Sequence, residues 1–260
     1  MAGLLVGLIA GLLGGLVGVG GGVIIVPLMT ETLKFRQHEA HGTSLIAVVF
    51  TGVAGSVIYY LHGSVELAAA AVLAGMALIT VRLGAKYCCF LPEMTLKRTF
   101  GFFLIFVALV FLLKPFLPYV MEGSPPVWIR WIVLVLLGAL TGFISGMMGV
   151  GGGSFMIPMM VIFAGIPQHT AQGISLLAMI PASTLGAWTH WREGNIRTGR
   201  LPGLVAGVLT GVLVGGSFAH LIPERELRLV YTAILLYTAL RYLRLRNGPE
   251  VVCTLKEGQG

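Results

Sequence analysis

The chain alternates long apolar stretches with short polar segments along its whole length. The apolar stretches cover residues 2–29, 43–61, 65–91, 99–120, 127–163, 171–190, 201–222 and 229–243. A helix needs about 20 apolar residues to cross the hydrocarbon core of a bilayer, and most of these stretches are that long. No polar segment between them is longer than a loop. The pattern predicts an all-α polytopic membrane protein whose surroundings are the lipid bilayer.

Composition strengthens this interpretation. Hydrophobic residues make up 57% of the chain and charged residues 10%, with a mean hydropathy of +0.93. Soluble domains carry about 25% charged residues, so the composition excludes a soluble core of this size. The net charge of +7 lies in short loops. No basic stripe with interleaved aromatic residues indicates a nucleic-acid partner.

The apolar pattern occurs twice. A shift of 131 positions, without a gap, aligns residues 7–109 with residues 138–240. The shift places Gly18-Val19-Gly20-Gly21-Gly22 on Gly149-Val150-Gly151-Gly152-Gly153, and Pro27 on Pro158. Repeated halves are typical of membrane transporters, in which the substrate pathway lies between the repeats. We therefore divide the chain into a first transmembrane repeat, 1–122, a second, 127–246, and a C-terminal tail, 247–260.

The distribution of Lys and Arg distinguishes two topologies. If every apolar stretch crosses once, these residues divide nine to eight between the two sides. If the first segment of each repeat dips into the membrane and returns, each repeat has three crossings and the second is inverted. The division is then thirteen to four, as expected when basic residues concentrate in cytoplasmic loops. We expect inverted repeats with both termini cytoplasmic; the alternative is a kinked first segment that crosses fully.

The glycine triplets predict breaks in the first segment of each repeat. Each Gly costs about 1 kcal/mol relative to Ala in a helix and permits positive φ angles, and Pro27 and Pro158 weaken the helices further. Non-helical backbone at membrane depth is tolerated where it is buried in protein or lines a cavity. A half-helix that starts after the break presents free amides to an anion. The alternative is that the glycines only allow close helix packing.

Hydroxyl groups follow each break. Gly42-Thr43-Ser44 and Gly173-Ile174-Ser175 occupy equivalent positions, where we expect the next helix to begin. Alternatively, the two serines bond to their own helix. Lys and Arg are costly in the membrane interior, and this chain has none at the centre of a span. The predicted substrate-binding residues are Gly20, Gly21, Gly22, Thr43, Ser44, Gly151, Gly152, Gly153, Ser154 and Ser175.

Among the remaining polar residues there are candidates for proton transfer, but none for metal binding, disulfide bonds or cofactor binding. His38 and His169 could carry protons, since histidine titrates near neutral pH, or they could be solvated or structural residues beside loops. A metal site is not expected, because the second repeat has Gln172 where the first has His41. The cysteines lack the spacing of a disulfide framework, and no motif indicates a cofactor.

These motifs resemble the sulfite exporter TauE/SafE family over nearly the whole chain. The family motif maps onto Gly18 to Gly22 with Pro27, and onto Gly149 to Gly153 with Pro158; Ile174 departs from it where the first copy has Thr43. The resemblance implies an inner-membrane permease that moves sulfite, thiosulfate, sulfoacetate or another small sulfur-containing anion. It does not specify the oligomeric state, the direction of transport or the coupling ion.

Two other classes of function were weighed. Gly142-x-x-Ser145-Gly146, with His169 or His220 as the base, could belong to an intramembrane serine hydrolase. A membrane scaffold is the other alternative, but it would not explain helix-breaking glycines at membrane depth. We expect a transporter rather than an enzyme.

Overall fold

The computed structural model describes residues 2–113, 126–219 and 224–244; the predicted tail, 247–260, and His220 lie outside them. The described residues are helical almost throughout. In chain order the helices are α1 (Ala2–Val17), α2 (Gly22–Thr32), α3 (Gln37–Leu61), α4 (Leu67–Phe90), α5 (Glu93–Leu113), α6 (Val127–Met148), α7 (Gly153–Phe163), α8 (Gln168–Arg192), a 3₁₀ turn η1 (Thr198–Arg200), α9 (Leu201–Phe218) and α10 (Glu224–Arg244).

The helix boundaries repeat with the 131-residue shift. α7, α8 and α10 begin and end where the shifted bounds of α2, α3 and α5 fall. The predicted breaks are confirmed, because α1 ends at Val17 and α6 at Met148, and the next helices begin at Gly22 and Gly153. Pro27 and Pro158 lie inside α2 and α7 without ending them.

One expectation about helix starts is wrong. Thr43 and Ser44 lie inside α3, which begins at Gln37, and Ser175 lies inside α8. The start of α3 is stabilised by a capping box, in which the Arg36 amide donates to Glu39 Oε2 at 3.0 Å. Such a cap satisfies helix-start amides with polar side chains, so the helix extends beyond its apolar stretch.

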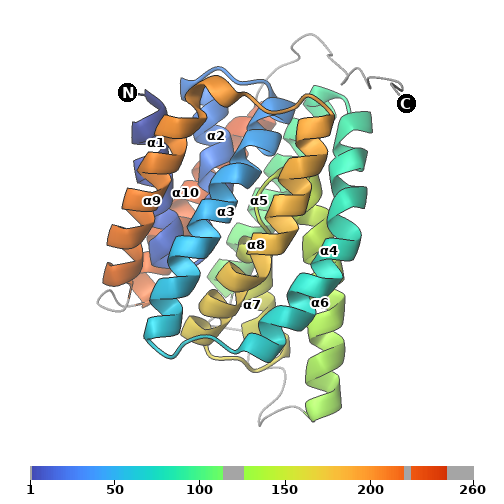
Figure 1. Ribbon diagram of the computed structural model, residues 1–260, viewed down its shortest axis with the longest axis vertical. Helices are drawn as coiled ribbons and strands as arrows, with labels where there is room; N and C mark the ends of the chain where they lie inside the picture. The colour runs from blue at the N-terminus through green and yellow to red at the C-terminus, as the bar shows by residue number, and fades with distance from the viewer. Residues whose placement is uncertain (1, 114–125, 220–223, 245–260) are drawn as a thin grey trace.

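The long helices α3 and α8 run antiparallel along the middle of the bundle (Figure 1). Gly42, near the start of α3, packs on the carbonyl of Asn195, just beyond α8; Gly173, near the start of α8, packs on the carbonyl of Ser64, just beyond α3. We call the end of the bundle that carries residues 193–197 the Arg197 end. The opposite end, with residues 62–66, is the Glu66 end.

In two further helix pairs, a helix of one repeat packs against a helix of the other. α1 runs parallel to α9, with Gly7, Gly11 and Gly15 each packed on α9 backbone progressively further along it. α6 runs parallel to α4 in the same way, through Gly138, Gly142 and Gly146. Small residues let helix backbones approach closely in membranes. The two halves therefore share one bundle.

These pairings fix the direction of the broken segments. Because α9 starts at the Arg197 end, α1 also starts there, and α2 returns to that end, where it joins α3 (Figure 1). α6 starts at the Glu66 end with α4, and α7 returns to the Glu66 end, where it joins α8. Each broken segment thus forms a hairpin within the bundle.

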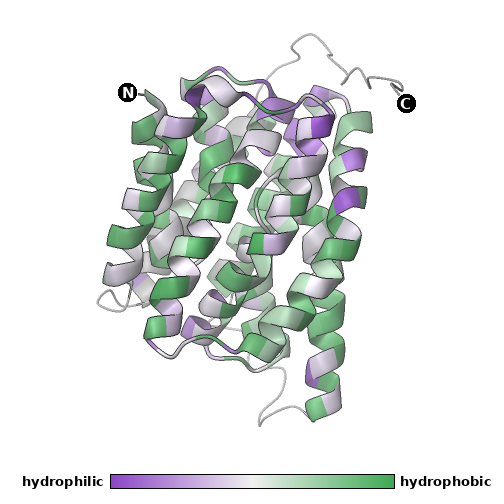
Figure 2. Ribbon diagram, in the orientation of Figure 1, coloured by the Kyte–Doolittle hydropathy of each residue, from purple (hydrophilic) through white to green (hydrophobic). Residues whose placement is uncertain are grey.

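Hydropathy identifies the surface that lipid covers. Four of the described helices, α3, α4, α6 and Thr198–Phe218, are long and apolar enough to cross a membrane. Large apolar side chains such as Ile79, Leu83 and Phe102 are exposed on the outside of the bundle. Hydrophilic residues gather mainly toward its two ends (Figure 2). The protein is a multi-pass membrane protein.

Candidate functional site

The two glycine breaks meet each other inside the bundle. Gly22 packs on the carbonyl of Val150, and Gly153 packs on the carbonyl of Val19, so each break contacts the backbone of the other. Residues 18–22 and 149–153 are all buried. A Cβ on Gly22 would lie 2.6 Å from the Val150 oxygen, which is too close for any other residue type.

Left-handed backbone makes the turns at both breaks. Gly20 and Gly21 have φ angles of 84° and 71°, and Gly151 and Gly152 have 79° and 83°. Residues with a Cβ pay roughly 1–2 kcal/mol for this conformation. The sequence GVGGG is therefore required by the turn as well as by the close approach of the two backbones.

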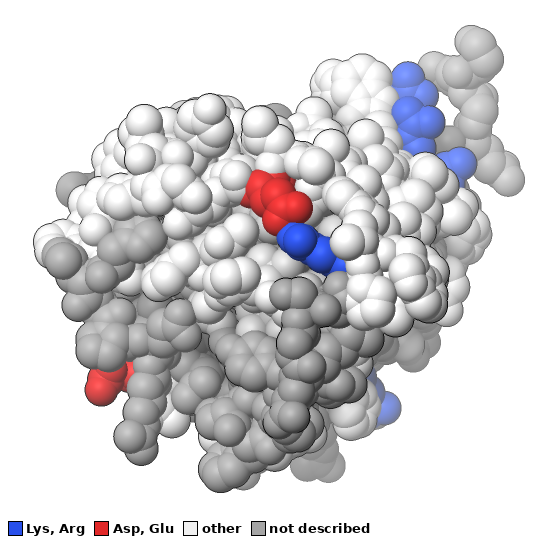
Figure 3. Space-filling view, turned by 90° about the horizontal axis from the view of Figure 1, so that it is seen from below, with Lys and Arg blue, Asp and Glu red and all other residues white. Residues whose placement is uncertain are grey.

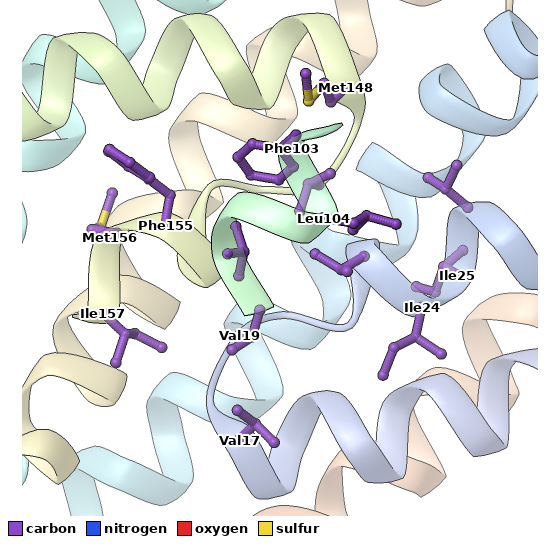
Figure 4. Packing of buried hydrophobic residues seen from close by; sticks show 14 of the residues in the cluster. Val17, Val19, Ile24, Ile25, Phe103, Leu104, Met148, Phe155, Met156 and Ile157 are labelled. Carbon is purple, nitrogen blue, oxygen red and sulfur yellow. The ribbon is translucent and has the colours of Figure 1, made fainter. Parts of the chain in front are cut away.

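Side chains from the two central helices pack between the breaks. Val48 of α3 and Met179 of α8 occupy equivalent positions in the two repeats. A Cβ on Gly20 would lie 2.5 Å from Met179 Sδ and 3.6 Å from Val48 Cγ1, and the same two residues are neighbours of Gly151. Further apolar side chains from α1, α2, α5, α6 and α7 crowd around the breaks (Figure 4).

The predicted serines lie at the breaks, and each hydroxyl reaches the opposite repeat. Ser44 Oγ lies 2.7 Å from the carbonyl oxygen of Gly149 and 2.8 Å from that of His41. Ser175 Oγ lies 3.0 Å from the carbonyl oxygen of Gly18 and 2.8 Å from that of Gln172. Each hydroxyl has one proton, which it donates to these carbonyls. The serines therefore hold the breaks together, and they also bond to their own helices.

Two more pairs of equivalent residues satisfy the carbonyl ends of α1 and α6. Gln172 Nε2 donates to the carbonyl of Val17 at 2.8 Å, and His41 Nδ1 donates to the equivalent carbonyl of Met148. His41 Nε2 then accepts from Gln37 Nε2 at 3.0 Å. The last carbonyls of a helix have no partner within it, and at membrane depth they require one. These donors provide it from the other repeat.

The second pair donates to carbonyls two residues earlier in α1 and α6. Tyr59 Oη lies 3.5 Å from the carbonyl oxygen of Gly15 and 3.2 Å from Gln172 Oε1, and His190 Nε2 lies 2.8 Å from the carbonyl oxygen of Gly146. Sequence reasoning missed both pairs, because the repeat alignment places Tyr59 on His190 and His41 on Gln172. Only the shared role of donor to an equivalent carbonyl identifies them.

The amide ends of α2 and α7 differ from these carbonyl ends. The first amides bonded within α2 are those of Ile24 and Ile25, both to the Gly21 carbonyl; in α7 they are Phe155 and Met156, both to Gly152. Neither helix start has a side-chain cap. The amides of the preceding residues remain available to an acceptor at the centre of the bundle.

Three of the predicted site residues lie away from the breaks. Thr43 Oγ1 accepts from the Arg197 amide at 3.2 Å, at the Arg197 end. His38 is buried at the same end, with Nδ1 3.6 Å from Cys88 Sγ. His169 is the second residue of α8, at the Glu66 end. Gly20 to Gly22, Ser44, Gly151 to Gly153, Ser154 and Ser175 do lie at the breaks.

Ion pairs lie at both ends of the bundle, some within one helix and some between elements. At the Arg197 end, Glu39 pairs with Arg197 at 3.0 Å and with Arg36 at 3.6 Å, and Glu93 pairs with Lys97 at 2.9 Å. At the Glu66 end, Glu66 pairs with Arg130 of α6. Seen from below, the described surface has few charged residues (Figure 3).

Comparisons with known proteins agree with this architecture. The model of the family described as sulfite exporter TauE/SafE matches residues 3–242. The probable membrane transporter protein YdhB of Bacillus subtilis is 27% identical over 232 residues, 88% of this chain and 92% of that protein. YunE of the same organism, also a probable membrane transporter, is 25% identical over 240 residues, covering 84% and 88%.

A probable membrane transporter protein of Haemophilus influenzae is 27% identical over 254 residues, which are 93% of this chain and 86% of that protein. No solved structure matches. The paired glycine breaks are covered by the family match. The chain therefore belongs to the sulfite exporter TauE/SafE family and is a membrane transporter, not an enzyme.

Proposed function

We propose that this protein is a secondary transporter for a small anion, most simply sulfite or another sulfur-containing oxyanion or organosulfonate. The main support for an anionic substrate is the difference between the carbonyl ends and the amide ends of the helices at the breaks. Side chains cap the carbonyl ends of α1 and α6, whereas no side chain caps the amide ends of α2 and α7. An uncapped helix start favours an anion. The family and its transporter relatives support the same class of substrate.

We further infer that the repeats are inverted in the membrane of the cell, the inner (plasma) membrane. The α1–α2 hairpin has both ends at the Arg197 end, and the α6–α7 hairpin has both ends at the Glu66 end. The basic segments around Arg36, Arg197 and the end of α10 also share the Arg197 end. On the positive-inside rule we assign this end, and with it both termini, to the cytoplasmic side.

This arrangement supports a mechanism of alternating access. The central helices α3 and α8 contact both breaks, and ion pairs close the bundle between different elements at each end. Rocking of one repeat against the other would open one end at a time. In this conformation the residues at the breaks are buried, which corresponds to an occluded state.

The membrane potential is the favoured source of energy. Export of an anion from a negative-inside cell is downhill by about 2.3 kcal/mol per charge per 100 mV. Glu39, Glu66 and Glu93 lie in ion pairs at the ends of the bundle, not at its centre. His38 and His169 are the candidate proton carriers, but each lies about two helical turns from Ser44 or Ser175, the residues of the same helix that bond to a break. We therefore favour potential-driven export over obligatory proton coupling.

Transport in proteoliposomes tests the proposal. Purified protein would be reconstituted and assayed with labelled sulfite, thiosulfate, sulfate and sulfoacetate at a clamped potential and at several pH gradients. We expect saturable transport of at least one of these anions that follows the potential. Absence of transport for all four would contradict the proposed substrate class. Accumulation driven by the pH gradient alone, and abolished in His38→Gln or His169→Gln, would contradict potential-driven export.

A further inference from the structure

Three buried serines of the second repeat have hydroxyls without a partner. Ser145, Ser154 and Ser183 are each at most 1% exposed, and among the described residues no protein atom accepts from them or donates to them. Several other buried hydroxyls bond to their own helices, such as Thr51 to the Ala47 carbonyl at 3.0 Å and Thr141 to the Leu137 carbonyl at 2.6 Å. The buried Thr232 hydroxyl also lacks a partner, but it belongs to α10, outside the two broken segments. A buried polar group without a partner is costly, so these three serines require an explanation.

All three lie around the second break. Ser145 Cβ is 3.8 Å from the position that a Cβ on Gly152 would take. Ser154 is the second residue of α7, within the uncapped helix start. Ser183 lies across from Val48, because α3 and α8 are in a register that places Gly186 on Leu45 and Gly52 on Met179. Val48 is in turn a close neighbour of Gly151.

The first repeat has no counterpart of this hydroxyl set. The equivalents of Ser145, Ser154 and Ser183 are Gly14, Val23 and Gly52. A Cβ on Gly14 would lie 2.6 Å from the amide nitrogen of Gly21, so no hydroxyl-bearing side chain fits there. The two breaks share a backbone geometry, but serine hydroxyls without a protein partner lie only at the second among the described residues.

The positive charge available at the breaks limits the charge of the anion that can bind there. Arg82 and Lys86, the basic residues along α4, are exposed on the outside of the bundle. The titratable side chains that face the second break are His41 and His190, which both donate to carbonyls of α6. With both imidazoles neutral, the positive potential at the breaks comes from the starts of α2 and α7, equivalent to roughly half an elementary charge each. Their sum is about one charge. A second negative charge would be buried without compensation, which is strongly unfavourable.

We propose that Ser145, Ser154 and Ser183, together with the start of α7, bind the transported oxyanion in its singly charged form. A hydroxyl both donates and accepts, so a serine can donate to an ionised oxygen or accept from a protonated one. Hydrogensulfite offers both kinds of oxygen, whereas sulfate, a dianion at neutral pH, offers only ionised ones. This inference rests on the proposed function and specifies which half of the site contacts the anion.

Substitutions at Ser154 test it with a matched pair. Valine, the residue of the first repeat, and threonine have the same shape, but only threonine has a hydroxyl. In reconstituted protein, labelled sulfite should be transported by Ser154→Thr with a KM close to that of the wild type. Ser154→Val and Ser145→Ala should each raise the KM about tenfold or more, as expected for the loss of a hydrogen bond to a charged group. Thermal melting in detergent would verify that the variants are folded.

Ser56→Ala is the control, because this serine of the first repeat bonds to its own helix, at the Val53 carbonyl, and its equivalent is Ala187. Its KM should stay within twofold of the wild-type value. If the wild type transports sulfite and Ser154→Val has an unchanged KM, the serine site is wrong while the transporter remains. If the wild type transports none of the anions tested, the proposed function itself fails.

The charge state has a separate readout. The apparent KM for total sulfite should rise as the pH increases through the second ionisation of sulfite, while the KM calculated for hydrogensulfite stays constant. Sulfate should compete poorly at every pH. A KM that is constant when calculated for the dianion, or strong competition by sulfate, would overturn the monoanion assignment.

Discussion

The break between α1 and α2 and the break between α6 and α7 have the same helix boundaries and the same left-handed glycines, but different side chains surround them. The last carbonyl of α1, that of Val17, accepts from Gln172, whereas the last carbonyl of α6, that of Met148, accepts from His41. Two residues earlier in the same helices, the donors are Tyr59 and His190. The backbone geometry tolerates only glycine, whereas several side chains can satisfy the same carbonyl from the same position.

The largest effect is expected when a glycine of a break gains a side chain. Gly152 has a φ angle of 83°, so Gly152→Val is strained by its backbone alone, and the same holds for Gly21→Val. We expect both to abolish anion transport while the protein still reaches the membrane. Gly75→Val is the control, because Gly75 has open space around it on α4. Wild-type transport by both break variants would place the site elsewhere.

Removal of a cross-repeat donor should have the next largest effect. His41→Ala leaves the Met148 carbonyl buried without a donor, which costs about 1–3 kcal/mol. His41→Gln should recover most of this stability, since glutamine occupies the equivalent position of the second repeat and donates to Val17. Thermal melting of the three proteins in the same detergent measures the difference. Equal melting temperatures for the alanine and glutamine variants would refute the equivalence of the two donors.

Variants of the adjacent residues Thr43 and Ser44 should show whether the anion binds at the breaks or at the Arg197 end. Ser44→Ala removes the donor to Gly149 and should destabilise the protein by about 1 kcal/mol and slow transport. Thr43→Val removes only an acceptor beside Arg197, so its transport rate should remain near that of the wild type. A greater transport loss in Thr43→Val than in Ser44→Ala would show that the anion contacts Thr43 after all.

The smallest effects are expected for the ion pairs at the two ends. The Arg130–Glu66 pair is partly exposed, and in the Arg197–Glu39 pair the arginine is exposed while Glu39 is buried; pairs open to solvent contribute about 0–1 kcal/mol. Glu66→Gln and Glu39→Gln should therefore change the melting temperature little, and less at high salt. A large loss of stability in either variant would show that these pairs hold the bundle together.

The sequence predicted the two breaks well because three adjacent glycines inside an apolar segment have few other uses. It also predicted that Ser44 and Ser175 lie at the breaks. The sequence pattern also predicted Thr43 at a break, because α3 was expected to begin at Gly42. In the structure the polar turn from Gln37 is helical as well, since Glu39 caps it. The donors His41, Tyr59, Gln172 and His190 could not be predicted, since each acts across the repeats through packing that only the three-dimensional structure reveals.

We propose that the two hairpins enter the bundle from opposite sides of the membrane. Arg36 and Pro167 are equivalent, exposed residues that directly precede α3 and α8. In intact cells, a membrane-impermeant thiol reagent should label Pro167→Cys and leave Arg36→Cys unlabelled until the cells are broken, with the wild type as background. Labelling of both variants from outside, or of Arg36→Cys alone, would contradict the inverted arrangement and the anion site built on it.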